Sequence, residues 1–159
     1  MTPLEVVIAW HTEYKTDPQG ANDRYLADDV QMLLPRSRPL IGRTAVGNKL
    51  ANVARDYTEL EYAGISPYTV MAEQGDIVFH RFRWKGTTVK GETVDFFLVN
   101  LYRVQDEKIV AWEEHFDTYA RYQHDYGYEP SDYFEGYEPE SRLIIPSNVN
   151  VPEGQESLR

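Results

Sequence analysis

One segment in the second half of the chain reads Ile109-Val110-Ala111-Trp112-Glu113-Glu114-His115-Phe116-Asp117, and it alternates in the manner of a β-strand. Trp112, Glu114 and Phe116 therefore share one face. Val110 is predicted on the same face, which is apolar except for the single carboxylate. Taking a carboxylate out of water is costly unless it is paired or protonated. Glu114 is thus the first candidate functional residue, and the alternative is a carboxylate in solvent or in an ordinary salt bridge.

The strand predicted before it, residues 93–104, also carries one polar group on an apolar face. The residues that share this face are Val94, Phe96, Leu98, Asn100 and Tyr102. The Asn100 amide must find hydrogen bonds, either inside the protein or from a ligand. Asp95 lies on the opposite face and is expected in solvent or at a subunit interface.

The strand predicted over residues 77–85 has two contrasting faces. Its even positions are Val78, His80, Phe82 and Trp84, and its odd positions include Arg81, Arg83 and Lys85. The pattern alone buries the even face and leaves the cationic face in solvent. His80 would then be the polar residue turned inward, and its ordinary pKa near neutrality suits acid–base chemistry.

The first half of the chain predicts helices. Thr2-Pro3-Leu4-Glu5 has the form of a capping box, so a helix is expected from residue 3, and Asp17-Pro18-Gln19-Gly20 ends it. Further helices are predicted over residues 21–26 and 42–55. A short strand is predicted over 30–34, and further strands over 58–62 and 68–73. Three helices followed by a curled antiparallel sheet form an α+β layout.

Composition limits the range of partners. The 159 residues fit one domain, and a net charge of −10 argues against nucleic acid and anionic membranes. The absence of cysteine excludes a disulfide, a thiol nucleophile and a thiolate metal site. The sequence shows no metal-ligand spacing, phosphate-binding loop or signal-peptide pattern. We expect a cofactor-independent, soluble, cytoplasmic protein.

Several short sequence motifs resemble those of the nuclear-transport-factor-2-like superfamily. The resemblance is to the branch of SnoaL-like polyketide cyclases, limonene-epoxide hydrolases and ketosteroid isomerases. They are the aromatic first helix, Ala27-Asp28-Asp29-Val30, Ile41-Gly42-Arg43-Thr44 and Lys108 to Asp117. The resemblance implies a cone-shaped curved sheet packed against three N-terminal helices, with a pocket inside the cone. It implies a domain over residues 1–125 and a homodimer through the convex sheet face. Residues 126–159 form a tyrosine-rich extension, expected to be a lid or a subunit arm.

The resemblance also implies site residues. Arg81 and Glu114 fall on the bridging arginine and the water-activating aspartate of the epoxide hydrolases. This register turns Arg81 and Arg83 into the pocket, against the alternation pattern, and we favour it because it gives Glu114 a cationic partner. Arg83 replaces the acid-donating aspartate of these enzymes, and Met32 and Leu34 replace their water-holding residues. The ketosteroid isomerase positions fall on Trp10, Leu34 and Asn100, of which Asn100 alone keeps a weak hydrogen-bond donor.

The predicted function is that of a cofactor-independent acid–base enzyme acting on a small apolar cyclic or aromatic molecule. Glu114 is the expected base, Arg81 its partner or an oxyanion stabiliser, and Arg83 and Asn100 further donors, with His80 replacing Arg81 in the other register. The expected walls are Trp10, Tyr14, Leu34, Phe96, Leu98, Trp112 and Phe116. A lyase or cyclase step, by elimination or retro-aldol cleavage, is favoured over an atypical epoxide hydrolase. The competing class is a non-catalytic binding or interaction module, which a collapsed cone would indicate.

Overall fold

The computed structural model describes residues 1–35 and 37–116 as three helices and seven strands. The helices are α1 (Pro3–Tyr14), α2 (Pro18–Tyr25) and α3 (Arg43–Arg55). The strands are β1 (Leu26–Leu33), β2 (Leu40–Ile41), β3 (Tyr57–Tyr62), β4 (Val70–Gln74), β5 (Ile77–Thr88), β6 (Thr93–Gln105) and β7 (Lys108–Phe116). The predicted extension over residues 126–159 lies outside the described residues.

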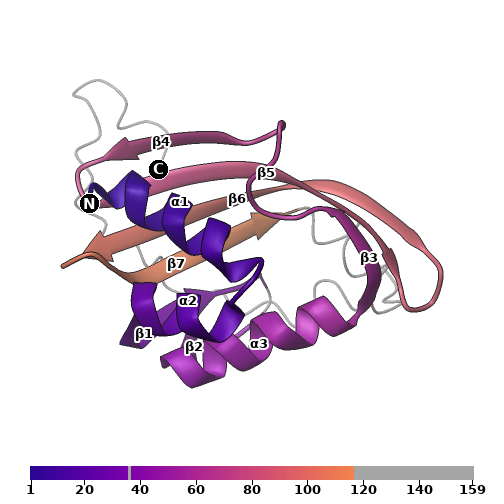
Figure 1. The fold of residues 1–159 in the computed structure, drawn as a ribbon, viewed down its shortest axis with the longest axis horizontal. Coiled ribbons are helices and arrows are strands. Elements are labelled where there is room, and N and C mark those ends of the chain that lie inside the picture. The colour runs from indigo at the N-terminus through magenta and orange to yellow at the C-terminus, as the bar shows by residue number, and fades with distance from the viewer. Residues whose placement is uncertain (36, 117–159) are drawn as a thin grey trace, which may run out of the picture.

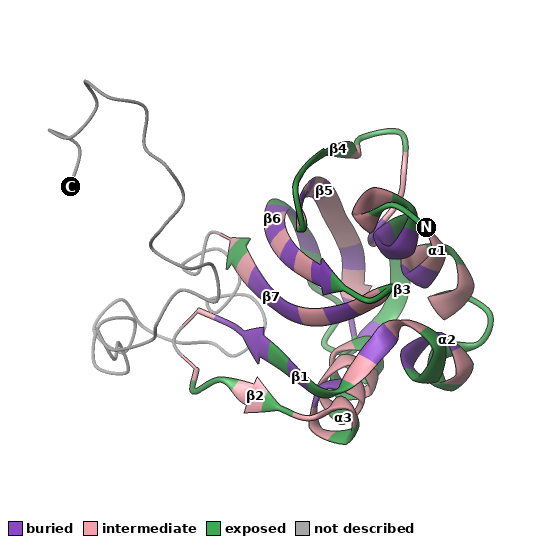
Figure 2. Cartoon of the chain, turned by 90° about the vertical axis from the view of Figure 1, so that its left-hand side faces the viewer, coloured by how far each residue is buried: buried purple, intermediate pink, exposed green. Residues whose placement is uncertain are grey.

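The strands form one curved sheet, in the order β2-β1-β7-β6-β5-β3, with β4 also paired to β5. The three helices lie on one side of this sheet, as Figures 1 and 2 show from two directions. The predicted α+β cone with three helices is confirmed. The sheet is mixed rather than wholly antiparallel, because β1 pairs with β7 in parallel.

Helix α1 begins with the predicted capping box. The backbone N–H of Glu5 donates to the Thr2 hydroxyl at 3.2 Å, and the Thr2 N–H donates to the Glu5 carboxylate at 2.8 Å. Each bond satisfies a donor that the first helical turn leaves free. The start of α1 is therefore fixed by its own sequence.

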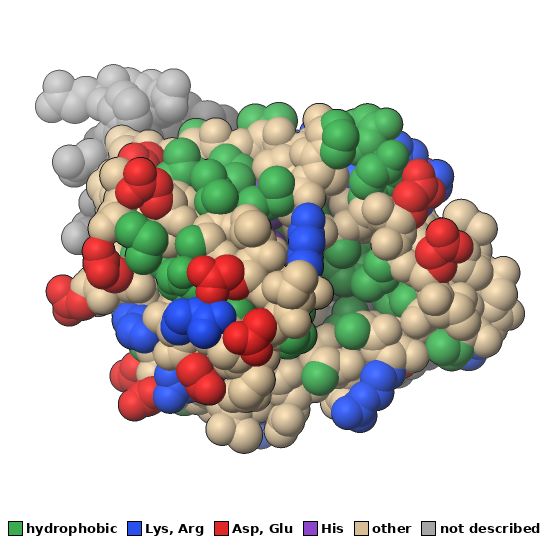
Figure 3. Space-filling model, in the orientation of Figure 1, with side chains coloured by type: hydrophobic (Ala, Val, Ile, Leu, Met, Phe, Trp, Pro, Cys, Tyr) green, Lys and Arg blue, Asp and Glu red, His purple; other side chains and the backbone are tan. Residues whose placement is uncertain are grey.

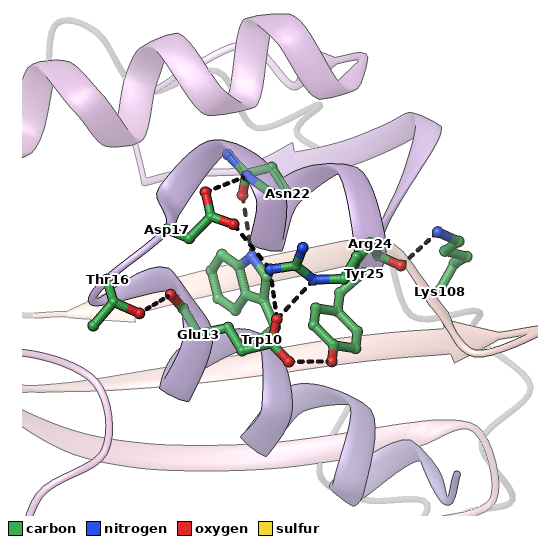
Figure 4. Close-up of polar contacts among 9 residues, drawn as sticks. Trp10, Glu13, Thr16, Asp17, Asn22, Arg24, Tyr25 and Lys108 are labelled. Carbon is green, nitrogen blue, oxygen red and sulfur yellow. Dashed lines mark hydrogen bonds and ion pairs between the residues drawn. The ribbon is translucent and has the colours of Figure 1, made fainter.

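Polar contacts join α1 to α2, and Figure 4 shows them. Glu13 accepts hydrogen bonds from Arg24 at 2.7 Å and from the Tyr25 hydroxyl at 2.6 Å. The Trp10 indole N–H donates to Asn22 Oδ1 at 3.1 Å, and both residues are buried. These contacts hold the Trp10 ring against the inner side of the sheet, with its centroid 5.3 Å from that of Trp112.

Strand β5 turns its even positions inward, so the register that we favoured is wrong. Val78, His80 and Phe82 are buried, whereas Arg81 and Arg83 lie on the outer face. The Arg81 guanidinium carbon lies 3.8 Å from the ring centroid of Phe97, and Arg83 forms two hydrogen bonds with Asp95. The outer face can solvate or pair two guanidinium groups at lower cost than the apolar inner face.

Strand β7 contains a bulge that alternation cannot reveal. Val104 pairs with Ile109 and Arg103 pairs with Ala111, which leaves Val110 as the additional residue. Ile109 therefore joins Trp112 in the core, and the predicted inward position of Val110 is wrong. Beyond the bulge Trp112, Glu114 and Phe116 keep their common face.

The core consists of two clusters of buried apolar side chains. The first lies between the helices and the sheet, and it includes Val6, Trp10, Leu34, Tyr102 and Trp112. The second includes Tyr57, Phe82, Phe96 and Leu98, with Phe116 packed against it. None of the described helices has the length and apolar character needed to cross a membrane.

Candidate functional site

A cavity of about 690 Å³ opens between the C-terminal part of α1, helix α3, the segment after β3 and the inner face of the sheet. Its walls include Trp10, His11, Tyr14, Leu50, Val53, Leu60, Tyr62, Ile65, Phe82, Trp84, Tyr102 and Trp112. Figure 3 shows the molecule hollowed here, with hydrophobic side chains inside. A volume of this size is typical of small-molecule sites.

A row of polar residues crosses the inner face. His80 of β5 pairs with Asn100 of β6, and Asn100 pairs with Glu114 of β7. The neighbouring rows are apolar on this face, since Phe82 pairs with Leu98 on one side. Asn100 and Glu114 line the cavity. The row exists because each of three adjacent strands carries one polar residue at the same level.

Two hydrogen bonds extend this row toward α1. The Asn100 amide nitrogen donates to the Tyr102 hydroxyl oxygen at 2.8 Å. His11 Nε2 lies 3.0 Å from the same oxygen. With its oxygen already accepting from Asn100, the Tyr102 hydroxyl can donate its proton to an unprotonated His11 Nε2. The three side chains then form one directed chain of hydrogen bonds.

Burial keeps these groups uncharged. It raises the pKa of Tyr102, an effect that the Glu114 carboxylate reinforces and the Asn100 hydrogen bond opposes. Burial also lowers the pKa of His11, assisted by His80 and Lys15. The pKa of His80 falls to about 4 because of burial. At neutral pH the site therefore holds a phenol and two neutral imidazoles next to Glu114.

His80 is packed among rings. Its ring stacks on Phe82 at 4.5 Å and meets His11 edge to face at 4.7 Å, both measured between centroids. The side chain is 0% exposed, and within the described structure neither of its nitrogens has a hydrogen-bond partner. The Asn100 Oδ1 atom is likewise buried and unpartnered there.

The segment after β3 closes one side of the cavity. Residues 63–67 line it, and the Lys15 ammonium group at the end of α1 donates to the Ile65 carbonyl at 3.1 Å. Gly64 has a φ of +72°, and a Cβ atom there would lie 2.8 Å from His11 Nδ1. Glycine is needed at this position both for the backbone conformation and for the close approach to His11.

The predicted site residues divide into those that line the cavity and those that do not, and His80 is among those outside the lining. Asn100, Glu114, Trp10, Tyr14 and Trp112 line the cavity. Four predicted wall residues belong to the core clusters and not to the described cavity lining: Leu34, Phe96, Leu98 and Phe116. The two predicted arginines, Arg81 and Arg83, lie on the outer face of the sheet. Arg81 cannot be the partner of Glu114, because cross-strand pairing places the two side chains on opposite faces of the sheet.

Sequence reasoning underrated two residues. Tyr102 was predicted on the face of Asn100, yet its hydroxyl received no role. His11 has helical spacing with the aromatic residues of α1, which is also what an ordinary packing residue shows. Their contact joins α1 to β6, so no local pattern could have revealed it. Within residues 1–35 and 37–116 no group of three His, Cys, Asp or Glu side chains is placed to hold a metal ion.

Comparisons with known proteins bear on the fold and the family. A family model described as a SnoaL-like domain matches residues 6–112, more than half of the chain. No curated protein sequence matches the chain.

Solved structures share the fold. A nuclear-transport-factor-2-like protein from Burkholderia thailandensis E264 is 18% identical, with a TM-score of 0.66 over 77% of this chain and 96% of its own. A Pseudomonas putida KT2440 protein, provisionally assigned as a polyketide cyclase, is 17% identical, with a TM-score of 0.64 over 76% and 96%. A Mesorhizobium loti protein, provisionally assigned as a SnoaL-like polyketide cyclase, is 25% identical, with a TM-score of 0.55 over 72% and 99%.

Proposed function

We propose that this chain, which belongs to the SnoaL-like domain family, is an enzyme that moves protons on a small, mostly apolar ring compound held in the cavity. The observation that carries the proposal is the position of Glu114 in the lining of an open cavity of about 690 Å³. A cone filled by its own aromatic side chains would instead favour a structural role. Trp10, Trp84 and Trp112 provide flat apolar walls for a ring.

In the proposed reaction Glu114 is the general base. Its carboxylate removes a proton from a carbon next to a carbonyl group, and the electron pair moves onto the carbonyl oxygen to give an enolate. In a cyclisation the enolate carbon attacks a second carbonyl of the same molecule. The resulting alkoxide takes the proton back from Glu114, so no other reactant is consumed. The reverse sequence is a retro-aldol cleavage.

The enolate needs hydrogen-bond donors, and the outward position of Arg81 removes the expected one. The inner face offers neutral donors in its place. The Trp112 indole N–H is buried in the cavity wall and has no hydrogen-bond partner among the described residues. A donor already held in a dry site stabilises developing charge without reorganising. An epoxide hydrolase mechanism loses its support, because its bridging arginine would have been Arg81.

Replacement of Glu114 by Gln tests the proposal. The amide keeps the shape of the side chain and cannot take up the proton. Turnover of a panel of cyclic ketones, polyketide-like diketones and aromatic diols is measured for the parent, Glu114→Gln and Glu59→Gln. Glu59 is an exposed carboxylate on β3, which makes it a matched control for the charge change.

We expect Glu114→Gln to lower turnover by about a hundredfold or more, with ligand affinity retained. Glu59→Gln should behave as the parent does. Equal turnover in all three proteins would remove Glu114 from the mechanism. Binding of panel compounds without turnover by the parent would show a binding module rather than an enzyme.

A further inference from the structure

Two cross-strand neighbours on the inner face of the sheet, one in the cavity lining and one beside it, have buried polar atoms that nothing in the described structure satisfies. They are His80, with both ring nitrogens unpartnered, and Asn100, with its Oδ1 atom unpartnered. The side chains are 0% and 3% exposed. Leaving a buried polar group without a hydrogen bond destabilises the fold, so two adjacent ones require an explanation.

The two groups are complementary to a single hydroxyl group. A neutral imidazole has one N–H donor, and the low pKa of His80 keeps its ring neutral. The Asn100 amide already uses its nitrogen to donate to Tyr102, which leaves Oδ1 as an acceptor. One hydroxyl group can accept a hydrogen bond from His80 through its oxygen and donate its proton to Asn100 Oδ1. A carboxylate has no proton to give Asn100, and any anionic group would lie in the same row as Glu114.

The position of His80 and Asn100 relative to Glu114 sets the distance between the bound hydroxyl oxygen and the ligand atom that faces Glu114. His80, Asn100 and Glu114 are cross-strand partners on three successive strands. Adjacent strands lie about 4.8 Å apart, so an oxygen near the His80–Asn100 pair and an atom at Glu114 are separated by one to two strand spacings. One spacing is close to the separation of two oxygen atoms in 1,3 positions of a six-membered ring.

We infer that His80 and Asn100 form a second polar subsite, which holds one hydroxyl of a ring compound while the carbon or oxygen one strand spacing away faces Glu114. The inference rests on the proposed function, because it assigns the orientation of a ligand in the same cavity. Asn100 lines the cavity and His80 lies beside it outside the lining. The substrate class is an uncharged ring with two oxygen substituents in a 1,3 relation.

Calorimetric binding of three bicyclic probes tests the subsite. The probes are 1,3-dihydroxynaphthalene, 1,5-dihydroxynaphthalene, which has a different oxygen spacing, and 1-naphthol, which has one oxygen. The parent should bind the 1,3 isomer about tenfold more tightly than either of the others. His80→Phe keeps a flat ring against Phe82 and should reduce this preference to less than threefold.

Asn100→Leu serves as the second variant and should lose the same preference. Equal affinities of the parent for the three probes would overturn the subsite and leave the function of Glu114 untouched. A preference that survives in His80→Phe would also overturn it, since the hydroxyl would then be held elsewhere. Failure of all three probes to bind the folded parent would overturn the proposed function as well.

Discussion

The buried imidazole of His80 should make the stability of the fold sensitive to acid. The pKa of His80 in the fold is about 4, compared with 6.5 for a solvated imidazole. Above pH 6.5 the ring is neutral in both the folded and the unfolded chain and contributes nothing to the pH dependence. As the pH falls from 6.5 to 4, the unfolded chain binds a proton that the folded chain does not, so stability is lost.

The size of the loss follows from the two pKa values. Each unit of difference corresponds to about 1.4 kcal/mol, so His80 should remove about 3 kcal/mol of unfolding free energy between pH 7 and pH 4. This is a large share of the 5–15 kcal/mol typical of single domains. The lowered pKa of His11 acts in the same direction.

Comparison with His80→Phe isolates the contribution of this one ring. Carboxylates also titrate in this range, and they do so in both proteins, so the difference between the two proteins removes most of their effect. Urea unfolding followed by tryptophan fluorescence at pH 7, 6, 5 and 4 gives the free energy of each. The parent should lose about 3 kcal/mol relative to the variant over this range. A difference that stays constant from pH 7 to pH 4 would refute the assignment of a buried neutral imidazole.

Two further predictions test the wall of the cavity and the outer face. Gly64→Ala places a side chain on a backbone with φ of +72° and brings its Cβ atom to 2.8 Å from His11 Nδ1. Thermal unfolding should therefore show a loss of about 1–2 kcal/mol of unfolding free energy. A melting temperature equal to that of the parent would contradict this packing. Arg83→Met removes a partly exposed pair with Asp95, so it should change the melting temperature little and leave turnover unchanged. A hundredfold fall in its turnover would instead place Arg83 in the reaction.

Local sequence signals predicted much of the fold because their causes are local. The capping box of Thr2 and Glu5 fixes the start of α1 by contacts within four residues. The alternation in β5 reflects the choice between an apolar face and a solvated face, and it placed His80 inward correctly. Our preference for the family register overrode that pattern at Arg81 and Arg83. The preference failed because an arginine on the inner face would have lost the water and the Asp95 contact that the outer face provides.

Features that depend on distant parts of the chain were not predictable in this way. The bulge at Val110 arises from the register between β6 and β7, and the parallel pairing of β1 with β7 joins segments on either side of α3. The sequence did indicate Glu114 and Asn100 as polar residues on apolar faces. It could not show that His80 shares their row, since this requires the register of three strands at once.

The parallel contact between β1 and β7 has a consequence for the order in which the protein folds. Strands β5, β6 and β7 pair with their nearest neighbours in sequence, whereas Met32 of β1 meets Trp112 near the end of the described chain. Loop-closure entropy delays contacts between distant segments, so the three-strand meander should form first and β1 should dock later, bringing the helices with it. The helical wall of the cavity is thus completed last. During synthesis on the ribosome the nascent chain should therefore be unable to bind its ligand until β7 has emerged. A ligand would then stabilise only the completely folded domain.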